Sequence, residues 1–179
     1  MRPALALGLG IVLGILVVPA AIYLYFALGN PPVAVADDAF PFEKQIVRVP
    51  LHARIEAEMP KEPAIPATDE NLVAGASIYR EQCASCHGLK GRKSSFGAAM
   101  YPSTPQLWEK HRNGVVGVSD DPAGMTYWRV KNGIRLTGMP SYQKLLNETQ
   151  MWQVSLLLSK ADKPLPAAAE EAVSKPIGQ

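Results

Sequence analysis

The only two cysteines of the chain lie three positions apart, in the sequence Cys83-Ala84-Ser85-Cys86-His87. A disulfide between them would close a loop too small to stabilise a fold, so the pair indicates chemistry rather than scaffolding. Cys-x-x-Cys-His is the pattern through which a haem is attached covalently. One motif predicts one haem c, with both thiols bonded to the porphyrin and His87 as a ligand of its iron.

The N-terminal part of the chain carries no charge between Arg2 and Asp37, and Leu, Ile, Val, Ala and Gly dominate residues 3–28. A helix of that length crosses a hydrocarbon core of about 30 Å. A cleaved signal sequence ending at Ala34-Val35-Ala36 is the alternative, but signal apolar regions are usually only about 7–15 residues long. We therefore predict a transmembrane anchor over 1–29, with Arg2 on the cytoplasmic side and the rest exported.

Three further segments follow. Residues 30–67 contain seven prolines, which predict an extended, semi-rigid linker without long helices. Residues 68–162 are predicted to form the folded domain. Residues 163–179, rich in Ala, Pro and Glu, are predicted to be disordered. Apolar and polar residues do not alternate over any sustained stretch, so we expect an all-α protein.

Capping residues predict where the helices of the domain begin and end. Thr68 is placed to cap a helix that runs into the cysteine motif. A short helix over 125–132 should end at Gly133, and a second short one is expected near 106–111. Asn147 and Gln150 form a capping box at the start of the last helix, which should end near Ala161.

A second axial iron ligand is expected from one of six methionines. Met139 stands in Gly138-Met139-Pro140 on a loop between two predicted helices, where Gly allows close approach of the backbone and Pro fixes the turn. The other five have simpler explanations, and Met100 follows the cysteine motif too closely to reach the opposite haem face. We therefore predict His87 and Met139 as the two ligands of the iron.

Residues 68–162 resemble class I cytochromes c, especially the small bacterial domains of membrane-anchored respiratory cytochromes. The resemblance rests on the cysteine motif, Gly138-Met139-Pro140 and the final Trp-bearing helix in that order. It implies a cytochrome c fold of three to five helices around one covalently bound haem. It also implies that the first and last helices cross at Gly75, Tyr79 and Trp152.

The same resemblance suggests further pocket residues. Pro105-Gln106-Leu107 is similar to the family's Pro-x-Leu turn, whose proline carbonyl accepts a hydrogen bond from the proximal histidine, with Pro102 as the alternative proline. Pro105 and Leu107 are therefore expected at the haem. Trp128 and Tyr142 are expected to pack against the haem or the core, and either side chain can donate a hydrogen bond to a haem propionate.

Two other uses of the cysteines are disfavoured. A zinc site would need further ligands from His52, His87 or His111, and no second Cys-x-x-Cys or His-x-x-His accompanies the motif. A thioredoxin-like dithiol follows a strand and starts a helix, whereas this motif follows a predicted helix. His52 and His111 are expected to be solvated side chains.

The distribution of charge indicates which classes of partner the protein can bind. A net charge of +2 is too small to indicate nucleic-acid binding, but residues 84–146 hold nine basic residues against three acidic ones, a net charge of +6. These charges are expected either to be plain surface residues or to form a face that docks an acidic redox protein.

The expected function is one-electron transfer in a respiratory chain, by a carrier that has no substrate chemistry of its own. The expected location is the bacterial inner membrane, with a single span and the haem domain in the periplasm. A fixed haem subunit of a larger oxidoreductase complex is the alternative, and a haem enzyme or gas sensor with an open iron site is a third possibility.

Overall fold

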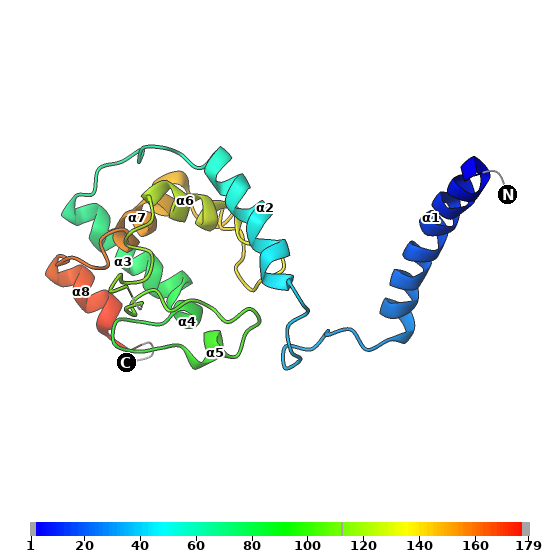
Figure 1. The fold of residues 1–179 in the computed structure, drawn as a ribbon. Coiled ribbons are helices and arrows are strands. Elements are labelled where there is room, and N and C mark those ends of the chain that lie inside the picture. The colour runs from blue at the N-terminus through cyan, green and yellow to red at the C-terminus, as the bar shows by residue number, and fades with distance from the viewer. Residues whose placement is uncertain (1–2, 112, 177–179) are drawn as a thin grey trace. The chain divides into compact units, whose positions relative to one another are not determined.

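The computed structural model describes residues 3–111 and 113–176, and the regular secondary structure of that part is helical. Within it no strand forms, and only isolated bridges join Leu89 to Arg92 and Lys110 to Val116. The all-α prediction is therefore confirmed. The chain divides into two compact units, residues 1–46 and 47–179, which we describe separately. The helices are α1 Pro3–Leu28, α2 Glu43–Glu58, α3 Asp69–Gln82, α4 Ala84–His87, α5 Ser95–Ala98, α6 Ala123–Asn132, α7 Glu148–Leu158 and α8 Ala167–Ser174 (Figure 1).

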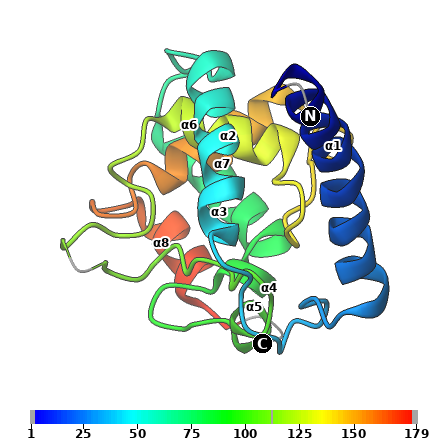
Figure 2. The same cartoon turned by 45° about the vertical axis from the view of Figure 1, so that its right-hand side comes forward.

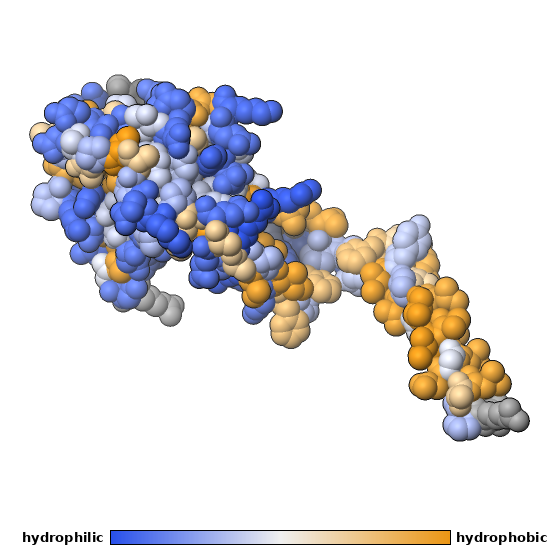
Figure 3. Space-filling model, turned by 90° about the horizontal axis from the view of Figure 1, so that it is seen from above, coloured by the Kyte–Doolittle hydropathy of each residue, from blue (hydrophilic) through white to orange (hydrophobic). Residues whose placement is uncertain are grey.

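Helix α1 dominates the first unit. Its 26 residues carry no charge, none of them is buried, and at 1.5 Å per residue the helix is long enough to cross a bilayer. Figure 3 shows this rod covered mainly by hydrophobic residues. Pro19 lies inside the helix without ending it. Helix α1 is thus a candidate membrane span, while Arg2, expected on the cytoplasmic side, lies outside the described residues.

The proline-rich segment differs from the prediction, because residues 43–58 form the 16-residue helix α2. Pro50 removes only one helical hydrogen bond, and packing compensates: Ile55 is 1% exposed. The end of α2 also contacts α6. Trp128 Nε1 donates to Glu58 Oε2 over 2.9 Å, and a Cβ on Gly124 would lie 1.9 Å from the carbonyl oxygen of Pro60. The second half of the expected linker is therefore part of the folded domain.

The expectation of a disordered tail is also wrong for residues 167–174. Helix α8 buries Ala169 and Val173 completely, against α3. The backbone N–H of Lys90 donates to the carbonyl of Val173 over 2.9 Å, and the Arg80 guanidinium binds carbonyls at the C-terminal end of α8. The tail thus supports the segment that follows the cysteine motif.

The core is built on the crossing of α3 with α7 (Figure 1, Figure 2). At the crossing, a Cβ on Gly75 would lie 2.3 Å from the carbonyl oxygen of Gln153, so only glycine permits this approach. The aromatic pairs differ from the expected contact of Tyr79 with Trp152. Trp152 stacks on Tyr127 of α6 at 4.2 Å, and Tyr79 packs edge-on against Trp108 at 5.6 Å.

The predicted helix ends are largely confirmed. Thr68 accepts the N–H of Asn71 at the start of α3, and the Asn147–Gln150 capping box is complete. Gly133 ends α6 with φ 67°. The helix expected near 106–111 does not form, since that stretch is a turn with irregular backbone on either side. Among the described residues of that loop, only the short α5 is helical.

Candidate functional site

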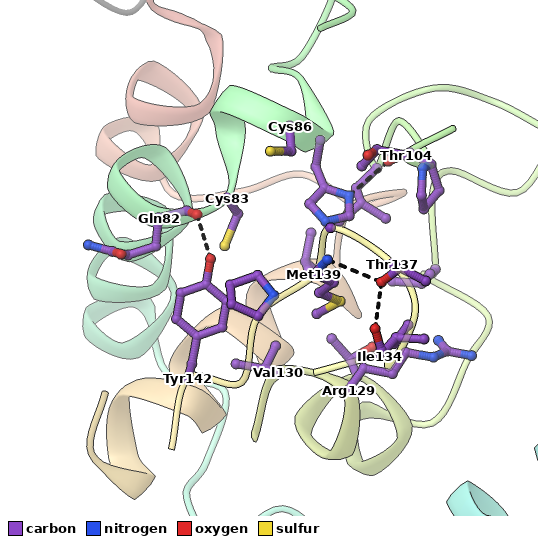
Figure 4. A pocket seen from close by; sticks show the side chains of 18 of the residues that line it. Gln82, Cys83, Cys86, Thr104, Arg129, Val130, Ile134, Thr137, Met139 and Tyr142 are labelled. Atoms are coloured by element: carbon purple, nitrogen blue, oxygen red, sulfur yellow. Dashed lines mark hydrogen bonds between the residues drawn. The ribbon is translucent and has the colours of Figure 1, made fainter. Parts of the chain in front are cut away.

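The cysteine motif folds as a single helical turn at the end of α3. Cys83 caps α3, and its carbonyl accepts the N–H groups of Cys86 and His87 over 3.1 and 2.9 Å. Residues three positions apart on such a turn are neighbours on one face. Both thiols are free and half-buried, and both line the same cavity (Figure 4). Burial, with a smaller contribution from Cys86, raises the pKa of Cys83 to about 12.

The imidazole of His87 is held by Pro105. Its Nδ1 lies 2.8 Å from the Pro105 carbonyl oxygen, and since a carbonyl only accepts, Nδ1 carries the proton. Nε2 is then the unprotonated nitrogen, the form that binds a metal. Burial lowers the pKa of His87, and the bond to Pro105 opposes this in part. The hydrogen bond expected from a proline carbonyl is thus present, and Pro105 rather than Pro102 provides it.

The cavity beside these residues has a volume of about 360 Å³, which is within the range of small-molecule sites. Its walls come from the cysteine turn, the loops 100–107 and 118–121, helix α6 with the loop 134–142, and one face of α7. Its lining is largely apolar and includes Leu107, Val118, Val130, Ile134, Val154 and Leu158. A mainly apolar pocket of this kind suits a large planar group.

Met139 reaches this cavity from a tightly fixed loop. Its backbone N–H donates to Thr137 Oγ1 over 3.1 Å, and that hydroxyl donates to the carbonyl of Ile134 over 2.7 Å (Figure 4). At Gly133 a Cβ would lie 2.7 Å from the backbone of Pro140, so the loop closes tightly on itself. The backbone from which the Met139 side chain enters the cavity is therefore fixed by the loop.

The residues of the site accordingly fit a covalently held haem. Two thiols, a correctly protonated imidazole and a thioether line one apolar cavity, and these are donors that bind haem and its iron. The sequence of residues 70–156 matches the family described as "Cytochrome C oxidase, cbb3-type, subunit III". Residues 70–156 form a cytochrome c domain. No curated protein and no solved structure matches the chain.

A cytochrome c domain implies covalently bound haem c and its iron. The alternatives find no support in the described part of the chain. It contains no group of three His, Cys, Asp or Glu side chains able to hold a metal ion. The cysteine turn follows helix α3 rather than a strand, unlike a thioredoxin-like dithiol. His111, expected to be free in solvent, bonds through Nε2 to the carbonyl of Gly117 over 2.8 Å.

Of the other residues expected in the pocket of the cytochrome c domain, two line the cavity and one does not. Leu107 and Tyr142 line the cavity, and Tyr142 donates its hydroxyl to the carbonyl of Gln82 over 2.7 Å. Burial, helped by the nearby cysteines, raises the pKa of Tyr142 to about 12. Trp128 does not line the cavity. It is buried on the other side of α6, where its N–H binds Glu58 and is not available to a haem propionate.

Sequence reasoning missed much of the cavity wall, including Met100, Arg129 and Asp121. Met100 lines it, accepts the hydroxyl of Thr104 over 3.3 Å, and contacts Gly138 on the Met139 loop. Arg129 and Asp121 also line it and form an ion pair of 2.7 Å. Helical register offered a signal for Arg129, because it shares a face of α6 with Thr126 and Val130.

Proposed function

We propose that this protein is a membrane-tethered electron carrier of a respiratory chain, with one haem c bonded to Cys83 and Cys86. In this proposal His87 and Met139 are the axial ligands of the iron. The observation that carries the proposal is the single apolar cavity that brings both thiols, the imidazole and the Met139 thioether together. Since the cytochrome c domain already implies haem-based electron transfer, the proposal adds the ligands, the single haem and the respiratory role.

When bound, a haem c supplies one-electron chemistry through the Fe²⁺/Fe³⁺ couple. The chain's own residues keep their positions during the transfer. Pro105 fixes the orientation and tautomer of His87, and the Thr137 hydroxyl holds the backbone of Met139. A thioether ligand and an apolar lining both favour the ferrous form and so raise the reduction potential. Arg129, on the same wall, offers a cation for the anionic propionates.

The membrane location follows from helix α1. We propose a single span in the bacterial inner membrane, with the second unit in the periplasm, where c-type haem is attached. A charge-free helix of 26 residues supports the span. A donor and an acceptor in the same membrane are the expected redox partners, and no feature of the chain suggests a nucleic-acid partner.

Charge supports docking of an acidic partner. Three of the basic residues in 84–146 form ion pairs: Lys90 with Glu170, Lys93 with Glu109 and Arg129 with Asp121. Among the described residues, Arg92, Lys110, Lys131, Arg135 and Lys144 have no ion-pair partner. Arg112, which also contributed to the count, lies outside the described residues. The unpaired cations supply the positive face that we propose for docking.

A fixed subunit of a larger oxidoreductase complex is the second candidate. The description of the matched family, which names an oxidase subunit, favours it. Purification from native membranes separates the two candidates. A subunit co-purifies with its complex in constant stoichiometry, whereas a carrier separates from its partners under mild detergent.

The ligand assignment is tested by absorption spectra of the haem-loaded protein and two variants, Met139→Ala and Met100→Ala. Met100 is the matched control because it also lines the cavity. We expect the low-spin His/Met spectrum in wild type and in Met100→Ala, and its loss in Met139→Ala. Loss of this spectrum in Met100→Ala alone would mean that Met100, and not Met139, is the ligand. Ready binding of carbon monoxide by reduced wild type would instead favour the open iron of a haem enzyme or sensor.

A further inference from the structure

The side chain of Gln106 connects three backbone segments around the cysteine turn. Its Oε1 accepts the backbone N–H of Ser94 over 2.7 Å. Its Nε2 donates to the carbonyl of Cys86 over 3.2 Å and to the carbonyl of Thr104 over 3.0 Å. The amide is partly buried, so these bonds are shielded from competition with water. One side chain therefore joins the loop 94–104 to the turn that bears His87.

The positions of these bonds matter more than their number. Cys86 directly precedes His87, and Thr104 and Gln106 flank Pro105. Gln106 thus holds the backbone next to both partners of the bond between His87 Nδ1 and the Pro105 carbonyl. The backbone N–H of Leu107 also donates to the carbonyl of His87, over 3.2 Å.

Two neighbours are arranged around this amide. Ser94 donates its hydroxyl to the carbonyl of Ser85 over 2.5 Å and accepts the N–H of Gly97 over 2.9 Å, which fixes the far side of the loop. At Gly88, with φ 76°, a Cβ would lie 2.6 Å from Gln106 Oε1. Glycine at position 88 therefore gives the amide room to reach the turn.

The bonding pattern requires an amide. One oxygen must accept, and one nitrogen must donate to two carbonyls at once, which neither a carboxylate nor an apolar group does. A glutamate of the same shape would place an acceptor against the carbonyls of Cys86 and Thr104, which repel it. Glutamate therefore tests the chemistry of the side chain with almost no change in its size.

We propose that Gln106 is a positioning residue that sets the strength of the His87–Pro105 hydrogen bond and thereby the reduction potential of the haem. The inference rests on the proposed function, in which His87 binds the iron. A hydrogen bond at Nδ1 makes the imidazole a stronger electron donor, which stabilises ferric iron. Weakening the bond therefore shifts the equilibrium toward ferrous iron and raises the reduction potential.

The experiment compares Gln106→Glu and Gln106→Leu with wild type, using full-length haem-loaded protein. Redox titration measures the equilibrium between ferric and ferrous forms. In Gln106→Leu we expect this equilibrium to shift threefold to tenfold toward ferrous iron, where tenfold corresponds to 59 mV for one electron. The negative charge of Gln106→Glu favours ferric iron, so its shift should be smaller than that of Gln106→Leu. The control is Gln153→Ala, which loses a bond of 3.0 Å from Nε2 to Asn71 at a position away from the cavity. It should leave the potential unchanged.

Two readouts separate positioning from a merely structural role. The Nδ1 proton resonance of His87 reports the strength of its bond to Pro105, and the urea midpoint reports stability. An unchanged potential and an unchanged proton resonance, in variants that are only less stable, would overturn the inference. Should neither Gln106 variant bind haem, Ser94→Ala loosens the same loop and must raise the potential in the same direction, or the inference is wrong.

The outcomes also separate this inference from the proposed function. A wild-type spectrum without a low-spin His-ligated haem contradicts the proposed function itself. A normal wild-type spectrum with no shift in the Gln106 variants contradicts only the role of Gln106.

Discussion

Gly75 lies where α3 crosses α7, and replacing it by alanine tests how tightly the core is built. In an ordinary helix Gly→Ala stabilises by about 0.8–1.0 kcal/mol. Here the new Cβ would lie 2.3 Å from the carbonyl oxygen of Gln153, while ordinary contact begins at 3.4 Å. The two backbones must therefore move apart by about 1.1 Å, because neither atom belongs to a flexible side chain.

Forced separation of packed elements costs about 1–3 kcal/mol, and a backbone contact lies at the upper end of that range. Subtracting the helix-propensity gain leaves a net destabilisation of about 2 kcal/mol for Gly75→Ala. Urea unfolding of the haem-loaded protein measures it, as the change in midpoint at constant m-value. Ser77→Ala, at an exposed position of the same helix, should change stability by less than about 0.5 kcal/mol. A Gly75→Ala variant as stable as wild type would refute the close crossing.

Three further predictions test the tail, the pocket and the charged face. Val173→Ala should lower the free energy of unfolding by about 2 kcal/mol, because it removes fully buried methyl groups of α8; no loss in urea unfolding would indicate a disordered tail. The raised pKa of Tyr142 means that its folded form keeps the proton longer, so stability falls as pH rises from 10 toward 12. Tyr142→Phe should show a smaller loss of stability over this pH range in unfolding experiments. The same dependence of stability on pH in both proteins would contradict a raised pKa of Tyr142. Electron transfer to the physiological acceptor should slow as ionic strength rises, whereas a flat response would contradict an acidic docking partner.

Local signals in the sequence were sufficient for the central helices and for the cysteine motif that lines the cavity. Thr68 and Asn147 cap helices because their side chains bond to backbone groups three positions away, and such bonds are visible in the sequence. The cysteine turn is equally local. The orientation of His87 was foreseen only through the resemblance to a family, since Pro105 lies 18 positions further along the chain.

Most of the errors concern long-range contacts. Helix α2 forms although Pro50 lies inside it, because Ile55 and Glu58 find partners in the folded domain. Trp128 was expected against the haem or the core, and it is buried away from the cavity because its hydrogen-bond partner Glu58 lies 70 positions away. Met100 was set aside as an iron ligand because it is close in sequence to His87, and its place on the cavity wall was not foreseen. Helix propensity and spacing carry no information on such contacts.

The packing of α2 on the domain shortens the flexible connection between α1 and the second unit. If residues 30–67 were extended throughout, the haem domain would move on a long and flexible connection. Because α2 begins at Glu43 and α1 ends at Leu28, only residues 29–42 join the two helices. Fourteen residues span at most about 50 Å when fully extended. If α1 spans a membrane, as proposed, this short connection keeps the second unit near the membrane surface, which favours partners in the same membrane over distant soluble proteins.

This confinement predicts the effect of releasing α2. Glu58→Ala removes the acceptor of the Trp128 N–H, and Arg54→Ala is the matched control, because it removes the exposed partner of Glu58 and leaves that hydrogen bond in place. In Glu58→Ala we expect faster protease cleavage within 43–58 and slower electron transfer to a membrane-bound acceptor, since a longer tether lowers the effective concentration of the haem domain. Arg54→Ala should behave as wild type in both assays. Equal protease resistance in all three proteins would mean that the Glu58–Trp128 bond does not hold α2 on the domain.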